Sequence, residues 1–179
     1  MSRKWKNTLY AVLLTAGILL LIYDRWLRQP SPLYMPRESP VEGRVIHIAD
    51  GDTFTMVLDD HTQERVRLQG IDAPERSQAF ANRSRQALGG LIYHKHVKVY
   101  FKRRDQYGRI LGTVYTDDST NVNLEMVKQG YAWHYKRYSS DKALAEAERQ
   151  ARRRHLGLWK DPHPQAPWLW RQTQREKLH

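Results

Sequence analysis

Cysteine is absent from this chain of 179 residues. Its absence excludes a disulfide scaffold, a zinc site built on thiolates, a cysteine nucleophile and a lipid-modified N-terminal cysteine. Acidic residues are scarce as well, because 19 Asp and Glu stand against 30 Lys and Arg, which gives a formal net charge of +11. This excess of positive charge favours a polyanionic partner, either nucleic acid or anionic lipid.

The chain is long enough for one domain with appendages, since domains usually contain roughly 100–200 residues. Hydrophobic residues make up 40% of the sequence and charged residues 27%. That balance provides enough apolar surface for a core and excludes disorder along the whole chain.

An uncharged run from Asn7 to Tyr23 precedes the domain and is 17 residues long. This length is the lower limit for a helix that crosses a hydrocarbon layer of about 30 Å. No small-residue cleavage motif follows it, so we expect a basic tail over residues 1–6 and an uncleaved transmembrane signal-anchor over residues 7–26. Removal of the segment as a signal peptide, which would give a secreted form, remains the alternative.

Two further segments flank the expected domain at residues 41–160. Residues 27–40 contain four of the eight prolines and predict an extended linker between membrane and domain. Residues 161–179 form a C-terminal extension that contains Trp168 and Trp170. We expect these indoles to pack back onto the domain, because large exposed apolar groups are costly.

The domain itself begins with short runs that favour β-structure and continues with helical runs. Alternating and β-rich patterns predict five strands, over residues 41–48, 53–58, 65–71, 97–102 and 110–115. Helices are expected over residues 77–92, 123–129 and 141–155, with Ser77, Asn121 or Asn123, and Asp141 as N-caps. This order indicates an α+β domain, a five-stranded Greek-key β-barrel of the OB type with three helices.

Chemically active side chains concentrate in three short motifs: DGDT at 50–53, RLQGIDAPE at 67–75 and DQYGRILG at 105–112. Each motif alone is typical of an ordinary turn or strand end. Together they contain the parts for phosphodiester hydrolysis. Two aspartates can hold one hard cation, a glutamate can take a proton from water, and two arginines can grip a phosphate.

These motifs make the chain resemble the staphylococcal-nuclease-like (thermonuclease) family from about Val41 to Trp159, and NLEMVKQGYA and a closing GLW match as well. The resemblance implies that Asp52 and Asp72 are calcium-binding carboxylates and that Ala73 lends its backbone carbonyl. The family often has Thr where Ala73 stands, so a hydroxyl contact would be missing. By the same resemblance, Glu75 is the general base.

The resemblance also implies how the substrate is held. Arg67 and Arg109 correspond to the arginines that grip the phosphate, and Tyr107 would lie near the nucleotide. The tyrosine-rich stretch that contains Tyr135 and Tyr138 falls where the family has substrate-binding tyrosines. The activity implied is a calcium-dependent, sugar-nonspecific endonuclease that cuts DNA and RNA and leaves 3′-phosphate ends.

Other functions remain open at the level of sequence. The barrel could be a catalytically silent module that binds nucleic acid or protein at the membrane. His134, Lys136 and Asp141 also fit the H-x-K-x₄-D motif of phospholipase-D-like enzymes, which use a phosphohistidine and no metal. That chemistry requires two such motifs.

The location of the domain is predicted from function more than from charge, because positive residues flank the expected span on both sides. A nonspecific nuclease in the cytoplasm would threaten its own genome, and cytosolic calcium is scarce. We therefore expect a single-pass protein of the bacterial inner membrane with its domain in the periplasm. No protein partner or oligomeric state is predicted.

Overall fold

The computed structural model describes Gly17 and residues 39–177. The predicted basic tail at residues 1–6 lies outside these residues, as do the signal-anchor apart from Gly17 and the linker apart from residues 39 and 40. Within the described part of the chain, no helix is both long and apolar enough to span a membrane.

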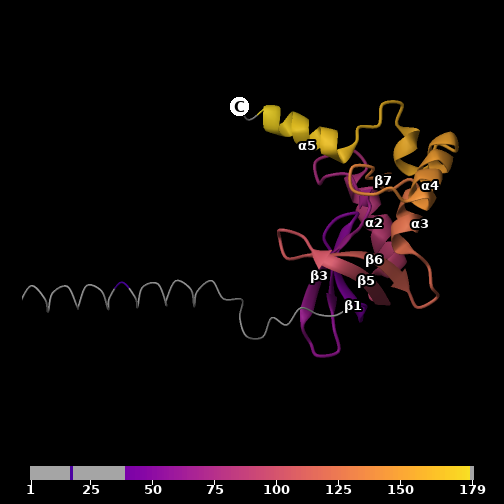
Figure 1. The fold of residues 1–179 in the computed structure, drawn as a ribbon. Helices are drawn as coiled ribbons and strands as arrows, with labels where there is room; N and C mark the ends of the chain where they lie inside the picture. Colours follow the sequence, from indigo (N-terminus) through magenta and orange to yellow (C-terminus); the bar gives the residue numbers. More distant parts are fainter. Residues whose placement is uncertain (1–16, 18–38, 178–179) are drawn as a thin grey trace, which may run out of the picture. The chain divides into compact units, whose positions relative to one another are not determined.

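The domain is built on a closed β-barrel of five strands, as the sequence predicted (Figure 1). Neighbouring strands pair antiparallel except for β3 and β6, which run parallel where the barrel closes. In order around the barrel, the strands are β1 (Val41–Ile48), β2 (Thr53–Val57), β3 (Gln63–Leu68), β6 (Ile110–Thr116) and β5 (His96–Arg104).

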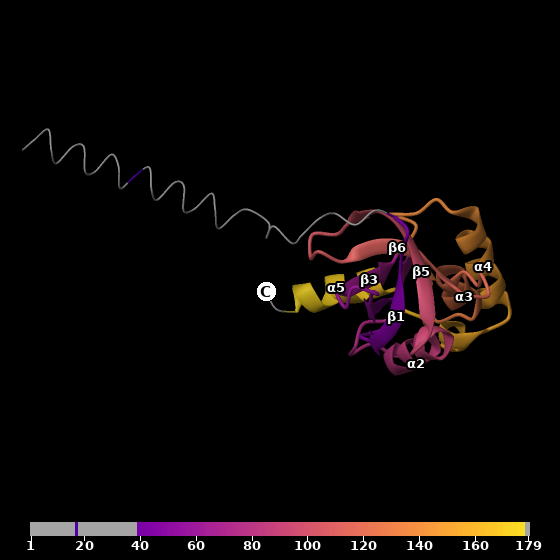
Figure 2. The ribbon, with the colours of Figure 1, turned by 90° about the horizontal axis from the view of Figure 1, so that it is seen from below.

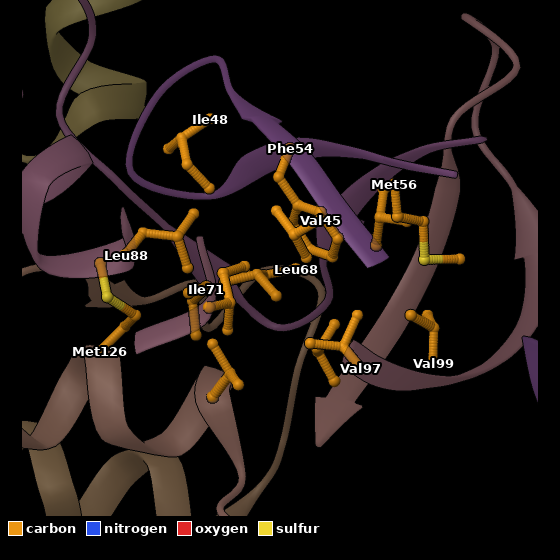
Figure 3. Packing of buried hydrophobic residues seen from close by; sticks show 14 of the residues in the cluster. Val45, Ile48, Phe54, Met56, Leu68, Ile71, Leu88, Val97, Val99 and Met126 are labelled. Atoms are coloured by element: carbon orange, nitrogen blue, oxygen red, sulfur yellow. The ribbon is translucent and has the colours of Figure 1, made fainter. Parts of the chain in front are cut away.

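Alternating side chains fill the barrel and extend its core toward two helices. Figure 3 shows Val45, Phe54 and Val97 from three strands beside Leu88 and Met126 from two helices, and all five are fully buried. Because successive side chains of a strand point to opposite faces, every second residue is directed inward. The same alternation leaves polar side chains free to line the outside of the barrel.

Four helices and some shorter elements complete the described domain. In both views α3 and α4 lie side by side, and α5 extends away from them (Figure 2). The helices are α2 (Ala81–Ile92), α3 (Val122–Lys128), α4 (Lys142–Arg153) and α5 (Pro167–Glu176), with the 3₁₀ helix η1 (Gly157–Lys160). Two two-residue strands, β4 (Ile71–Asp72) and β7 (Trp133–His134), pair with each other.

The predicted helix starts are confirmed in two of three cases. The side chain of Asn121 accepts a hydrogen bond from the Leu124 N–H, and that of Asp141 caps α4 in the same way. Ser77 is not a cap, because the chain still turns there and α2 begins at Ala81. Phe80 precedes it with a left-handed φ of 66° and makes no side-chain cap.

The C-terminal extension contains α5, a helix that the sequence analysis did not predict. Pro167 begins it, at the position where the missing N–H of proline costs nothing. Trp168 packs on the domain as expected, edge-on to Trp133, with the ring centroids 5.6 Å apart. Together with Trp159 and Ala166 it belongs to a second apolar cluster beside α4 and η1.

Candidate active site

All nine residues singled out by the sequence line one cavity of about 670 Å³ beside the barrel. They come from the β1–β2 connection, β3, β4 and the loop after it, the β5–β6 hairpin, and the segment after β7. The nine are Asp52, Arg67, Asp72, Ala73, Glu75, Tyr107, Arg109, Tyr135 and Tyr138.

Asp52 lies in the loop between β1 and β2, and two hydrogen bonds orient its carboxylate. Its Oδ1 accepts from the Thr53 hydroxyl at 3.0 Å, and its Oδ2 accepts from the Ala73 N–H at 2.8 Å. Gly51 packs against α2 so closely that a Cβ there would lie 1.9 Å from Ser84 Oγ. A glycine is therefore required where this acidic loop meets the helix.

Asp72 lies on β4, only 1% exposed, and shares a guanidinium with Asp52. Arg67 Nη2 donates to Asp72 Oδ1 at 2.8 Å, and Nη1 lies 2.6 Å from Asp52 Oδ2. Burial lowers the pKa of Arg67, but the attraction of the two carboxylates outweighs it and the pKa is raised. Burial raises the pKa of Asp72, and repulsion from Asp52 adds to this.

Glu75 follows β4 and faces a residue that the sequence analysis missed. Arg171, on α5, donates from Nη1 to Glu75 Oε1 at 2.6 Å and from Nη2 to Asp72 Oδ2 at 2.8 Å. Burial lowers the pKa of Arg171, but the hydrogen bonds to Asp72 and Glu75, together with their charges, outweigh it and raise the pKa. No local motif surrounds Arg171, and only its place near Trp168 in the extension could have pointed to it.

Arg109 lies on the other side of the cavity, in the hairpin between β5 and β6. Its Nε donates to Asp105 Oδ2 at 2.7 Å, and its Nη1 reaches Thr53 Oγ1 at 3.4 Å. The exposed ring of Tyr107 stacks beneath its guanidinium, 5.5 Å from ring centroid to Cζ. Arg109 thus faces the loop that contains Asp52.

Asp50 is, after Arg171, the second cavity residue to which the sequence analysis assigned no role, because its motif is typical of a turn. Its Oδ1 accepts from the Asp52 N–H at 2.9 Å, and its side chain lines the cavity. Burial, followed by the charge of Asp52, raises the pKa of Asp50 to about 6. The DGDT motif contained this signal, since it places two carboxylates two residues apart.

Aromatic rings line the end of the cavity nearest α5. Tyr135 and Tyr138 meet edge to face, with centroids 4.8 Å apart. Trp168 stacks on Tyr135 with an interplanar angle of 4°. Rings arranged in this way offer flat faces to a nucleobase.

The residues of the H-x-K-x₄-D motif have other partners. His134 is buried on β7, with its Nε2 3.2 Å from Ser139 Oγ. Lys136 pairs with Glu148 at 2.8 Å, and Asp141 caps α4. None of the three lines the main cavity, so the motif does not assemble a phosphohistidine site.

The cavity offers oxygen donors suited to a hard divalent cation. The carboxylates of Asp52 and Asp72 meet at one guanidinium, whose charge a cation could replace. Among Gly17 and residues 39–177, no three His, Asp or Glu side chains are grouped to hold a metal. A cation held by Asp52 and Asp72 would complete its shell with water and substrate oxygens.

The barrel and its cavity of carboxylates and guanidinium groups are suited to phosphodiester hydrolysis. Similarity to known proteins identifies the class as a nuclease, a hydrolase. The pattern of staphylococcal nuclease homologues matches residues 65–161. The chain is 42% identical to micrococcal nuclease from Shigella flexneri over 151 residues, 79% of this chain and 86% of that one. It is 45% identical to an uncharacterized endonuclease from Haemophilus influenzae over 132 residues, 74% of each chain. Protein ParB of Escherichia coli is 43% identical over 152 residues, 79% of this chain and 85% of that protein.

The chain belongs to the staphylococcal nuclease homologue family, which the motifs had indicated.

Proposed function

We propose that this nuclease is a calcium-dependent, sugar-nonspecific endonuclease that hydrolyses DNA and RNA to products with 3′-phosphate ends. The observation that carries the proposal is the convergence of Asp52, Asp72 and Glu75 with Arg67 and Arg109 in one cavity. A catalytically silent binding module would not need all five groups.

The proposed cation site consists of Asp52, Asp72 and the backbone carbonyl of Ala73. Calcium held there would supply positive charge to an oxygen of the scissile phosphate. Asp52 is already oriented for this role by the Ala73 N–H and the Thr53 hydroxyl. Because the Ala73 N–H donates to Asp52 Oδ2, it keeps Asp52 and Ala73, two of the three proposed ligands, close together.

The remaining groups act on phosphate and water. Arg67 and Arg109 bind phosphate oxygens and stabilise the negative charge that develops in the transition state. Glu75, whose side chain is 40% exposed, is open to water and accepts the proton of the attacking molecule. Tyr107 and Tyr135 contact sugar and base without reading their identity, so cutting is nonspecific.

Plasmid and single-stranded DNA incubated with the full chain test this proposal. We expect degradation in calcium, none in chelator, and losses in Glu75→Gln and Arg67→Gln. Arg175→Gln is the control, because this exposed arginine lies on α5 outside the cavity. Cutting that persists in chelator would contradict the calcium requirement, and products with 5′-phosphate ends would contradict the cleaved bond.

Nucleic-acid type and location are tested separately. RNA should be cut under the same conditions, because Arg67, Arg109 and Glu75 act on phosphate and water and none of the proposed contacts selects for the 2′-hydroxyl. We also propose that the domain lies in the periplasm, anchored in the inner membrane by residues 7–26. A reporter fused after Glu42 tests this. Reporter activity in the cytoplasm and none in the periplasm would overturn the proposed location.

A further inference from the structure

Arg171 reaches the cavity from beyond the region that the family pattern matches, which ends at residue 161. Its guanidinium makes three hydrogen bonds, two to Asp72 at 2.8 and 3.2 Å and one to Glu75 at 2.6 Å. The side chain remains 35% exposed and lines the cavity. It is therefore accessible to a ligand that enters there.

Arg171 and Arg67 each contact Asp72 together with one further carboxylate. The further carboxylate is Asp52 for Arg67 and Glu75 for Arg171. Arg67 contacts only Oδ1 of Asp72, whereas Arg171 contacts both oxygens. Asp72 thus lies between two arginines, of which Arg171 is the more exposed, 35% against 15% for Arg67. A ligand that displaces Arg67 from Asp72 faces the same kind of group in Arg171.

The helix that carries Arg171 is fixed to the domain. Three residues earlier, Trp168 stacks on Tyr135 at 5.2 Å and meets Trp133 at its edge. The side chain of Gln78 donates to the Gln165 carbonyl just before the helix. Arg171 is consequently positioned by packed structure, and less entropy is lost when it binds a ligand.

The charges in the cavity determine what Arg171 can bind. Five carboxylates and five guanidinium groups line it, so the cavity is balanced before a ligand enters: Asp50, Asp52, Asp72, Glu75 and Asp105, against Arg67, Arg103, Arg104, Arg109 and Arg171. A cation bound by Asp52 and Asp72 shifts this balance to positive. Guanidinium donors that served Asp72 then become available to phosphate oxygens, which they fit in pairs.

We propose that Arg171 is a third phosphate-binding arginine of this cleft, supplied by α5 in addition to Arg67 and Arg109. The inference rests on the nuclease function proposed above. Its ligand is a phosphate group of the bound strand on the side of the cavity that Tyr135 lines.

The test compares Arg171→Gln with Arg175→Gln, which removes the same charge from the same helix outside the cavity. Initial rates of cutting of single-stranded DNA by the full chain are measured in calcium over a range of salt concentrations. Arg171→Gln should raise KM about tenfold, as expected for one lost charge-assisted hydrogen bond. It should also flatten the slope of log(kcat/KM) against log salt by about 0.7, the value for one phosphate contact.

Binding is measured independently of cutting. A labelled phosphorothioate strand, checked by gel to stay intact, should bind Arg171→Gln about tenfold more weakly by fluorescence anisotropy. Arg171→Lys should restore the salt slope but not the full affinity, because a lysine keeps the charge without the two-pronged geometry. Tryptophan fluorescence and thermal unfolding verify that α5 stays in place in each variant.

Two outcomes would overturn the inference while leaving the nuclease function intact. One is unchanged KM, affinity and salt slope in Arg171→Gln. The other is tighter calcium binding by calorimetry together with faster cutting, which would make Arg171 a competitor of the cation. If the unmodified chain itself cuts neither DNA nor RNA in calcium, the proposed function fails first.

Discussion

The two sides of the cavity are built by different means. On the side of the β5–β6 hairpin, the side chain of Arg109 donates to Asp105, four residues earlier. The backbone N–H groups of Tyr107 and Arg109 donate to the same carboxylate. On the side of α5, Arg171 pairs with Asp72 and Glu75, which lie 99 and 96 residues earlier. The hairpin side is formed by residues close together in the sequence, whereas the α5 side depends on the packing of a segment far along the chain.

The barrel therefore supplies Arg109 to the cavity, and the C-terminal extension supplies Arg171. The hairpin side depends on the pairing of β5 with β6, whereas the α5 side depends on the packing of Trp168 on Trp133 and Tyr135. A substitution should therefore damage both sides, or either one alone, according to where it falls.

Phe54→Ala should remove both sides together. Phe54 is fully buried in the barrel, so the loss of its ring should lower the free energy of unfolding by about 3–5 kcal/mol. Urea unfolding followed by fluorescence and circular dichroism measures this. Tyr93→Ala, an aromatic position 46% exposed, is the control and should change stability by less than about 0.5 kcal/mol. An equal effect in both variants would contradict the assignment of the core.

Arg109→Gln should disable the hairpin side alone. Removing one positioned donor of a transition-state site lowers kcat by about 10²–10³-fold. Rates on single-stranded DNA in calcium measure this, with Lys102→Gln, an exposed cation on β5, as control. A variant that cuts at the normal rate would exclude Arg109 from the reaction.

Trp168→Ala should loosen the α5 side alone. The variant loses the stack on Tyr135 and the edge contact with Trp133, for about 1–2 kcal/mol of stability. KM should rise with little change in kcat, because Arg171 is then less firmly positioned. Leu169→Ala is the control on the same helix, since Leu169 is 48% exposed. Identical KM values in the two variants would show that Trp168 does not fix α5.

Asp105→Asn should have the smallest effect, visible in the pH dependence of stability. Burial alone would raise the pKa of Asp105, but hydrogen bonds from the Arg109 side chain and from backbone N–H groups lower it below 3.8. A lowered pKa in the folded state stabilises the protein above the unfolded value, and this is lost as pH falls through the folded value.

Urea midpoints at about pH 5 and about pH 3 test this sign. The midpoint of the unmodified protein should fall more steeply between them than that of Asp105→Asn, by less than about 1 kcal/mol in unfolding free energy. A steeper fall in the variant would reverse the sign.

The sequence predicted the barrel because the alternation of residues such as Val97 and Val99 is a local pattern that also defines the buried face. The cavity could be predicted because its motifs each follow or connect strands. Arg171 could not be predicted, since its partners are brought to it only by the packing of α5. Ser77 was misassigned because a residue that favours caps also favours turns, and here the chain forms a turn.

The contact between Gly51 and Ser84 ties the loop that carries Asp50 and Asp52 to α2. Ser84 in turn donates its hydroxyl hydrogen bond to the Tyr131 carbonyl, ahead of β7. A larger residue at position 84 has no compensating change at position 51, because glycine is already the smallest residue. A larger residue at position 51 would meet the Cβ of Ala73 as well as Ser84, each at 2.8 Å or less. A helix that contributes no residue to the cavity thus limits how the acidic loop can evolve.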